Sequence, residues 1–342
     1  MKKILLLALL FVFSYSVNSE ELPAYKLYDK DGDEVDFSDL VDEALDHQIV
    51  FFGELHNNPI CHWLQLELSK AVYEENKNLT LGFEMFESDD QLIINEYFDD
   101  LYSENRFKSE MKLWNNFATD YKPLLEFAKE KDLELIATNT PRRYATMVAK
   151  KGFEELDSLT DEAKSYIAPL PIEVDLELPG YKKMGEMFGG SHGSAKPKMP
   201  AKSKKMRISN DSTHSGMARD PKAMRNSIAE PPSKSKMGKH PMKKSGSDMM
   251  TKLKQAQALK DATMAHFTME NLEDDGIFIH FNGTYHSNNF EGIVWFIKQK
   301  MPDMKILSIA SIEKDDLDEL TDEEKKLADF ILVIPKSMTK TY

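Results

Sequence analysis

The fold of this chain is decided by the stretch Ile49-Val50-Phe51-Phe52-Gly53-Glu54-Leu55-His56. Its four apolar residues predict a buried strand, which we expect Gly53 to end in a sharp turn. Asn58-Pro59 then supplies an N-cap and a first-turn proline, so a helix is predicted from residue 59. Ionisable side chains therefore follow the carboxyl end of a strand, where ligands bind in open α/β sheets.

The same pattern of an apolar strand followed by polar residues returns along the chain. Glu84 ends a predicted strand at residues 79–84, and Arg142 follows one at 133–137. A further strand at residues 276–283 runs into Gly283-Thr284-Tyr285-His286, the second Gly-x-x-His motif after Gly53–His56. Strands at 305–312 and 330–335, with helices between successive strands, predict an α/β fold with a largely parallel sheet flanked by helices and an added helical subdomain.

The predicted helices lie at 38–46, 59–76, 89–101, 122–131, 143–151, 161–166, 251–271 and 292–300, with an acidic helix between the last two strands. A hairpin around Asp31-Gly32 precedes them. His62 and His280 fall inside a helix and a strand, where packing explains a histidine better than ligation does.

The N-terminus has the composition of a cleavable signal peptide, residues 1–19. Two lysines precede a short apolar run, and small residues lead to an expected cleavage after Ser19. We expect export to a periplasm or secretion. Cys61, the single cysteine, is not placed for lipid attachment, and we expect it to be a small buried residue.

Residues 182–250 differ in composition from the rest of the chain. They hold 16 Lys and Arg against 5 Asp and Glu, a charge of +11 within a chain of net charge −14. Gly, Pro, Ser and Lys dominate, which predicts a disordered insertion into a single domain formed by residues 20–181 and 251–342. Ten methionines and three histidines suit Cu(I), although a solvated basic segment explains the composition as well. The acidic remainder gives no indication of nucleic-acid binding.

In a parallel sheet the strand ends share one edge, so His56 and His286 can meet although 230 residues separate them. Two imidazoles with Glu84 suit a divalent metal such as Zn, Mn or Fe. The same set could orient a cofactor or a water nucleophile. Tyr144 and Tyr285 are candidate iron ligands, because phenolate ligates haem.

Five short motifs in order resemble the ChaN family of haem-binding uptake proteins, within a wider Tiki-like group: Gly53–His56, Phe83–Phe86, Asn139–Arg142, Asp261–Ala265 and Gly283–His286. The resemblance implies an exported protein that binds haem or iron, sometimes as a homodimer, with a periplasmic or outer-membrane uptake partner. The residues predicted to line its cofactor site are Glu54, His56, Glu84, Arg142, Tyr144 and His286, with Tyr144 chosen as the haem ligand.

Relatives in the wider group imply a second function, metal-dependent hydrolysis of peptides or esters. In that case His56 and His286 hold the metal or position water, and Glu54 or Glu84 is the general base. The insertion at 182–250 and the absence of a lipoprotein cysteine depart from the family pattern.

Overall fold

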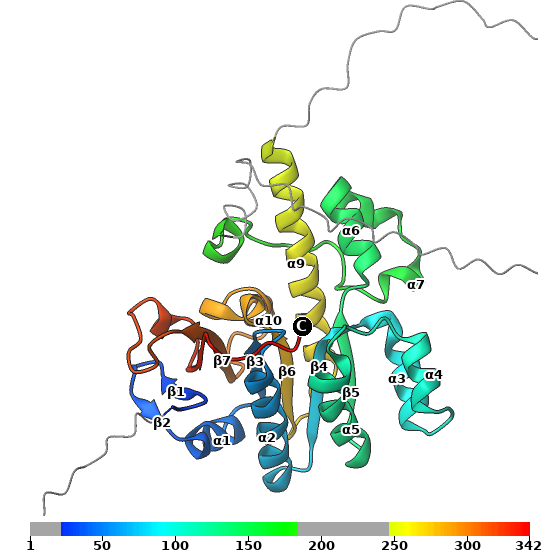
Figure 1. Cartoon of the computed structure of the whole chain (residues 1–342). Coiled ribbons are helices and arrows are strands. Elements are labelled where there is room, and N and C mark those ends of the chain that lie inside the picture. The colour runs from blue at the N-terminus through cyan, green and yellow to red at the C-terminus, as the bar shows by residue number, and fades with distance from the viewer. Residues whose placement is uncertain (1–21, 184–245) are drawn as a thin grey trace, which may run out of the picture.

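The computed structural model describes residues 22–183 and 246–342, which form a sheet of eight strands with helices on both faces (Figure 1). The strand order is β2-β1-β8-β7-β3-β6-β4-β5. Pairing is parallel from β8 to β5, and antiparallel only where β1 meets β2 and β8. The strands are β1 Lys26–Asp29, β2 Glu34–Val35, β3 Ile49–Glu54, β4 Leu79–Glu87, β5 Leu135–Asn139, β6 Ile277–Gly283, β7 Ile306–Lys314 and β8 Phe330–Pro335.

Nine helices connect and cover these strands in the described ranges. They are α1 Phe37–Leu45, α2 Pro59–Glu75, α3 Gln91–Phe98, α4 Glu104–Glu110, α5 Lys122–Glu130, α6 Arg142–Lys151, α7 Asp161–Lys164, α9 Gly246–Glu270 and α10 Ile293–Lys300. The predicted α/β class and parallel sheet are confirmed. Helix α4 was not predicted, and α9 begins at Gly246, inside the segment predicted to be disordered. None of the helices in the described ranges is long and apolar enough to span a membrane.

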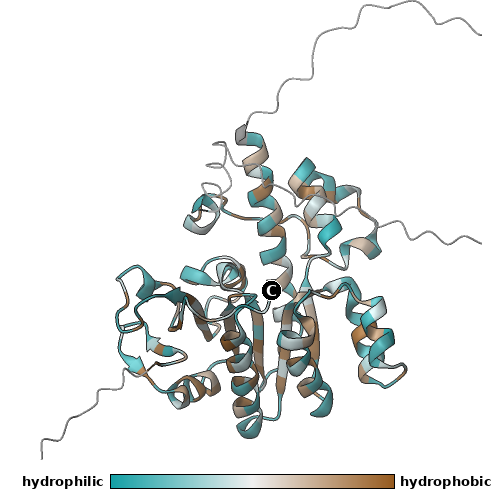
Figure 2. Cartoon of the chain, viewed as in Figure 1, coloured by the Kyte–Doolittle hydropathy of each residue, from teal (hydrophilic) through white to brown (hydrophobic). Residues whose placement is uncertain are grey.

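Alternation along the buried strands divides the core into two layers. Val50 and Phe52 face one side of the sheet with α1, α2 and α5, whereas Ile49 and Phe51 face α9 and α10. Figure 2 shows the central strands largely in brown, as expected for strands that are covered on both faces. The predicted site residues therefore lie at the end of a sheet that is packed on both faces, beside α9.

One prediction about local structure needs correction, and two fall outside the described residues. The segment between β7 and β8 contains only a 3-10 turn, Glu324–Lys326, in place of the predicted acidic helix, and it packs through residues such as Leu320 and Leu327. The predicted signal peptide lies outside the described residues, as do residues 184–245 of the insertion.

Gln91 of α3 covers the outer edge of β5, the last strand of the sheet. Its side-chain amide donates to the carbonyl of Leu135 (2.8 Å) and accepts from the backbone N–H of Ala137 (2.7 Å). A strand adding to β5 would use these same two groups. An uncovered edge invites pairing with another chain, so this amide protects the sheet.

We expect Gln91→Ala to destabilise the fold by about 1–3 kcal/mol, the contribution of two hydrogen bonds, and to promote self-association. Urea denaturation and size-exclusion chromatography measure the two effects. Gln299→Ala, at an exposed position of α10, is the control and should change neither. An unchanged midpoint in Gln91→Ala would show that water serves the β5 edge equally well.

Candidate functional site

The two Gly-x-x-His motifs are brought together by direct pairing of their strands. In the parallel register of β3 and β6, Gly53 lies opposite Asn282 and Glu54 lies opposite Gly283. Both strands therefore end at one edge of the sheet, and the histidine of each motif follows within three residues. This confirms the expected meeting of segments that lie far apart in the sequence.

The glycines of the motifs are required by close approach, not by a turn. Strand β3 continues through Gly53 to Glu54, so the predicted strand end at Gly53 is wrong. A Cβ at Gly53 would lie 2.8 Å from the carbonyl oxygen of Ile309, and one at Gly283 would lie 2.7 Å from His56 Nε2. Any side chain at these positions would push apart the strands or the imidazole.

Glu54 is buried at the centre of a hydrogen-bonded network. Its Oε1 accepts from His56 Nδ1–H (2.8 Å) and from the hydroxyl of Tyr121 (2.7 Å), and its Oε2 accepts from Gln65 (2.7 Å). Burial would raise the pKa of this carboxyl, but the charge of His62 and the hydrogen bond from His56 hold it below its ordinary value. Glu54 therefore stays ionised and fixes the orientation of the His56 ring.

His62 of α2 lies directly behind this network. Its Nδ1 lies 3.1 Å from Gln65 Oε1, and its Nε2 lies 3.2 Å from the carbonyl oxygen of His56. Asn116 donates to that same carbonyl (2.7 Å) and to Asp120 (2.6 Å). The position of His62 in a predicted helix does not indicate that it contacts the site. That contact depends on how α2 packs against the loop after β3.

His286 lies between two buried carboxylates. Its Nε2 is 3.1 Å from Glu84, and its Nδ1 donates to Asp261 of α9, which also accepts from the hydroxyl of Tyr181 (2.7 Å). Glu84 is held in turn by the backbone N–H of Gly283 (2.7 Å). Burial would lower the pKa of His286, but the two carboxylates raise it well above its ordinary value, so the ring is an imidazolium.

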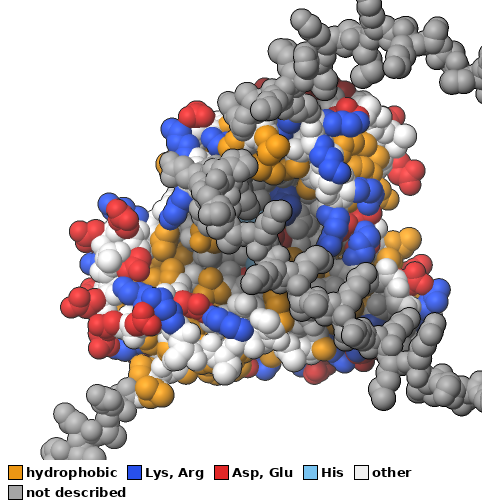
Figure 3. Space-filling model, turned by 45° about the horizontal axis from the view of Figure 1, so that its top comes forward, with side chains coloured by type: hydrophobic (Ala, Val, Ile, Leu, Met, Phe, Trp, Pro, Cys, Tyr) orange, Lys and Arg blue, Asp and Glu red, His pale blue; other side chains and the backbone are white. Residues whose placement is uncertain are grey.

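Two adjoining cavities open on this edge and share His56 and His286 in their walls. Cavity A, of about 640 Å³, also has Glu84, Trp114 and Lys260 in its wall. Cavity B, of about 340 Å³, extends toward Tyr181 and Tyr285. Both volumes fall in the range of small-molecule sites. In Figure 3 a hollow opens near the middle of this face, with Lys and Arg side chains on its right side.

Of the predicted site residues, the structure places His56, Glu84, Arg142 and His286 in the wall of cavity A. Glu54 lies beneath His56 and reaches neither cavity. Tyr144 belongs to the wall of neither cavity. Its ring packs against α9 through Leu259, while its hydroxyl accepts from Arg143. Tyr285 is 70% exposed beside cavity B, so it is the candidate ligand that a cofactor can reach.

The predicted metal ligands are only partly brought together. His286 contacts Glu84, but His56, Glu84 and His286 do not form a group with ligand atoms within 4.8 Å of one another. The set as it stands does not fit a divalent metal.

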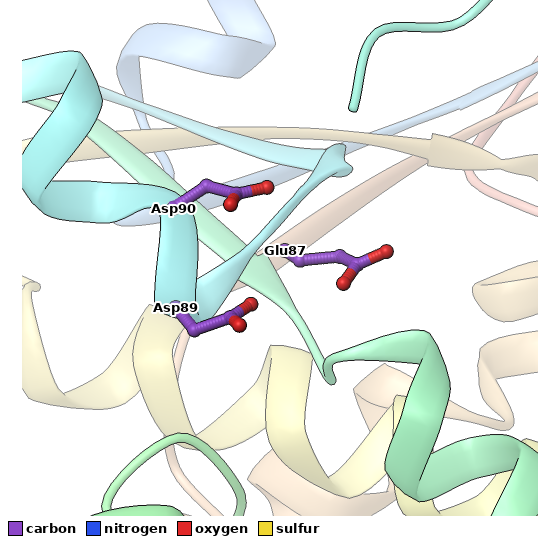
Figure 4. Close-up of side chains that lie close together, drawn as sticks. All are labelled: Glu87, Asp89 and Asp90. Carbon is purple, nitrogen blue, oxygen red and sulfur yellow. The ribbon is translucent and has the colours of Figure 1, made fainter. Parts of the chain in front are cut away.

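One group of three carboxylates in the described ranges does meet that spacing: Glu87, Asp89 and Asp90, at the end of β4 and in the turn after it (Figure 4). Three cations surround it. Lys112 lies 3.0 Å from Glu87 and 3.8 Å from Asp90, while Arg142 pairs with Glu87 and Arg143 pairs with Asp89. The arrangement is an ion-pair cluster that anchors the arginines, and it gives no indication of a bound metal.

The chain belongs to the family described as haem-binding uptake, Tiki superfamily, ChaN, whose model matches residues 40–297. Among solved structures it is similar to one described as cofacial heme binding to ChaN of Campylobacter jejuni. The two share 15% identity and a TM-score of 0.57, with 91% of this chain and 96% of that chain covered. At 15% identity this structural similarity shows that the two proteins share a fold, and nothing beyond the fold.

More distant similarities cover less or fit less well. A chloroplastic Arabidopsis thaliana protein, RETICULATA-RELATED 5, is 29% identical over 135 residues, which are 37% of this chain. The chain spans only 18% of the length of that relative. An erythromycin esterase in its open conformation overlaps 87% of the chain at 9% identity, with a TM-score of 0.43, too low to support an argument about function.

His280 supplies a prediction about pH. It is fully buried in β6, where its Nδ1–H donates to Asn282 (3.0 Å) and its Nε2 accepts from the hydroxyl of Thr138 (2.8 Å). Burial lowers its pKa from 6.5 to about 4. Between these values the unfolded chain binds a proton that the folded chain does not, so the unfolding free energy should fall as the pH falls through this window, by about 3 kcal/mol.

Urea denaturation at pH 7 and pH 4.5 measures this effect. We expect His280→Gln to lose part of the pH dependence seen in the parent protein, because the titrating group is gone. His47→Gln, near the surface end of α1, should retain it. Equal pH dependence in the parent protein and His280→Gln would contradict a depressed pKa at His280.

Proposed function

We propose that the protein binds haem at the edge where cavities A and B meet, as an exported protein of haem or iron uptake or storage. The observation that carries the proposal is the position of Tyr285, which is 70% exposed within the second Gly-x-x-His motif and lines cavity B beside His286. Membership of the haem-binding family supports it.

The residues present fit haem in three respects. Tyr285 offers an accessible phenol oxygen, a ligand type that haem iron takes. Arg142 and Lys260 in cavity A and Lys183 in cavity B offer cations for propionates. Trp114 packs on the ring of His56 at 4.8 Å between centroids and provides an aromatic wall. When bound, haem would supply an iron centre, and Tyr285 would hold it through its phenol oxygen.

The exposed aromatic surface at this edge supports a further part of the proposal, that two copies of the chain enclose haem. Phe290 is 42% exposed and follows Tyr285 on the same loop. The Campylobacter jejuni neighbour is described as binding heme cofacially. A partner in the periplasm or outer membrane would then deliver or receive the haem.

Tyr285→Phe tests the ligand directly. We expect haemin added to the purified protein to give a Soret band, and this substitution to weaken binding at least about tenfold, because it removes the accessible phenol oxygen. Tyr144→Phe is the matched control and should bind as the parent protein does. Loss of the band in Tyr144→Phe alone would move the ligand to α6. No Soret band in the parent protein would end the haem proposal.

A second candidate function is hydrolysis of an ester or peptide, favoured by the contact between Glu54 and His56. A buried carboxylate that fixes Nδ1–H leaves Nε2 of the imidazole to take a proton from water. Glu54 itself has its oxygens occupied by three donors and reaches no cavity. The base in this case is therefore His56, with Glu54 as its positioning residue.

Turnover of p-nitrophenyl esters tests this candidate. We expect His56→Gln to abolish it and Glu54→Gln to lower it at least about tenfold, through loss of ring orientation. A chelator should change little, because the metal set is incomplete. Glu75→Gln, at the exposed end of α2, is the control. Equal rates in His56→Gln and the parent protein would exclude the general base.

A further inference from the structure

Two buried polar groups in the wall of cavity A lack hydrogen-bond partners among the described residues. Thr140, 1% exposed, lies in this wall, and its hydroxyl has no hydrogen-bond partner among the described residues. The Oδ1 atom of Asn139, the preceding residue in the same wall, is likewise buried and unpartnered there. Buried polar groups are rarely left unsatisfied, and each one costs stability.

Helix α6 begins at the same place. Its first N–H groups have no intrahelical partner, and Pro141 at the N-cap provides no side-chain cap. The helix has ten residues, so its N-terminus carries partial positive charge next to Thr140. Such an N-terminus favours an anion.

Two cations complete the wall. Arg142 donates through Nε to Glu87 (2.5 Å), which holds the guanidinium in place and leaves its terminal nitrogens for a ligand. Lys260 reaches the cavity from α9 and forms no ion pair within the described residues.

The carboxylates of the same wall are already occupied. Glu84 accepts from Gly283 and contacts His286, while Glu87 is paired with Arg142 and with Lys112. Their negative charge is therefore balanced locally. Apart from the Oδ1 atom of Asn139, the unpaired groups that remain in this wall are a hydroxyl, helix N–H groups and cations. All of these interact favourably with an anionic oxygen.

We propose that cavity A binds a carboxylate through Thr140, Arg142, Lys260 and the N-terminus of α6. The carboxylate belongs either to a haem propionate or to a free organic acid. The first case rests on the proposed haem function, and the second is independent of it. Thr140 thus donates a hydrogen bond to the ligand in this proposal. Its hydroxyl makes no hydrogen bond within the described residues, so its removal breaks none there.

Thr140→Val is the central test, because it removes the hydroxyl and keeps the β-branched shape. We expect it to fold at least as stably as the parent protein, since it removes an unpaired buried group. It should nevertheless weaken carboxylate binding several-fold. Thr138→Val, in β5 two residues before Thr140, is the control. Its hydroxyl pairs with His280, so it should lose stability and keep carboxylate binding. Lys260→Met should weaken binding at least about tenfold, whereas Lys252→Met, which lines neither cavity, should not.

Two ligands distinguish the source of the carboxylate. Haemin is compared with its dimethyl ester by Soret titration, and succinate is titrated by NMR with the amide signals of residues 139–143 followed. Tighter binding of haemin than of its ester, with the difference lost in Thr140→Val, identifies a propionate. Succinate shifts that Thr140→Val weakens identify a free acid, even if haem does not bind at all. Equal haemin and ester affinities, together with no succinate shifts, would overturn the proposal.

Discussion

The parallel pairing of β3 with β6 is the constraint on which the site depends. It sets Glu54 opposite Gly283 and brings the two motif histidines to one edge. The contact is close enough that a Cβ at Gly283 would collide with the ring of His56. The glycine of one motif therefore makes room for the histidine of the other, and neither motif can be understood without its partner strand.

Strand-end reasoning predicted the part of the site that comes from the sheet. His56 and His286 each follow a recognisable apolar run, and parallel pairing brings such ends together. Glu84 was predicted to end its strand but lies inside β4, which continues to Glu87. The residues that were missed come from helices and loops: Gln65, Tyr121 and Asp261. Which helical face meets a strand end depends on long-range packing, and local spacing carries no signal of it. For Asp261 only its place in a family-like motif hinted at a role.

The two candidate tyrosines also show that exposure to solvent could not be predicted from the sequence. Tyr144 follows the motif at 139–142 closely, and proximity in sequence made it the preferred ligand. The start of α6 turns its ring toward Leu259 and away from the cavities. Tyr285 sits in a 3-10 turn directly after β6, where a short turn leaves the ring exposed. The two rings therefore differ in exposure because Tyr144 lies on a helix that packs against α9, whereas Tyr285 lies in a short turn.

The electrostatics of the edge follow from how completely its carboxylates are occupied. Glu54 has three donors, and Glu84 has a backbone N–H and an imidazolium. A buried carboxylate with such partners is stable as an anion but has little left for a ligand. The donors that the described part of cavity A leaves for a ligand are the Thr140 hydroxyl, the Lys260 ammonium, which forms no ion pair there, and the terminal nitrogens of the Arg142 guanidinium. The site is therefore built from acidic residues but presents donors and positive charge, which favours an anionic ligand over a metal cation.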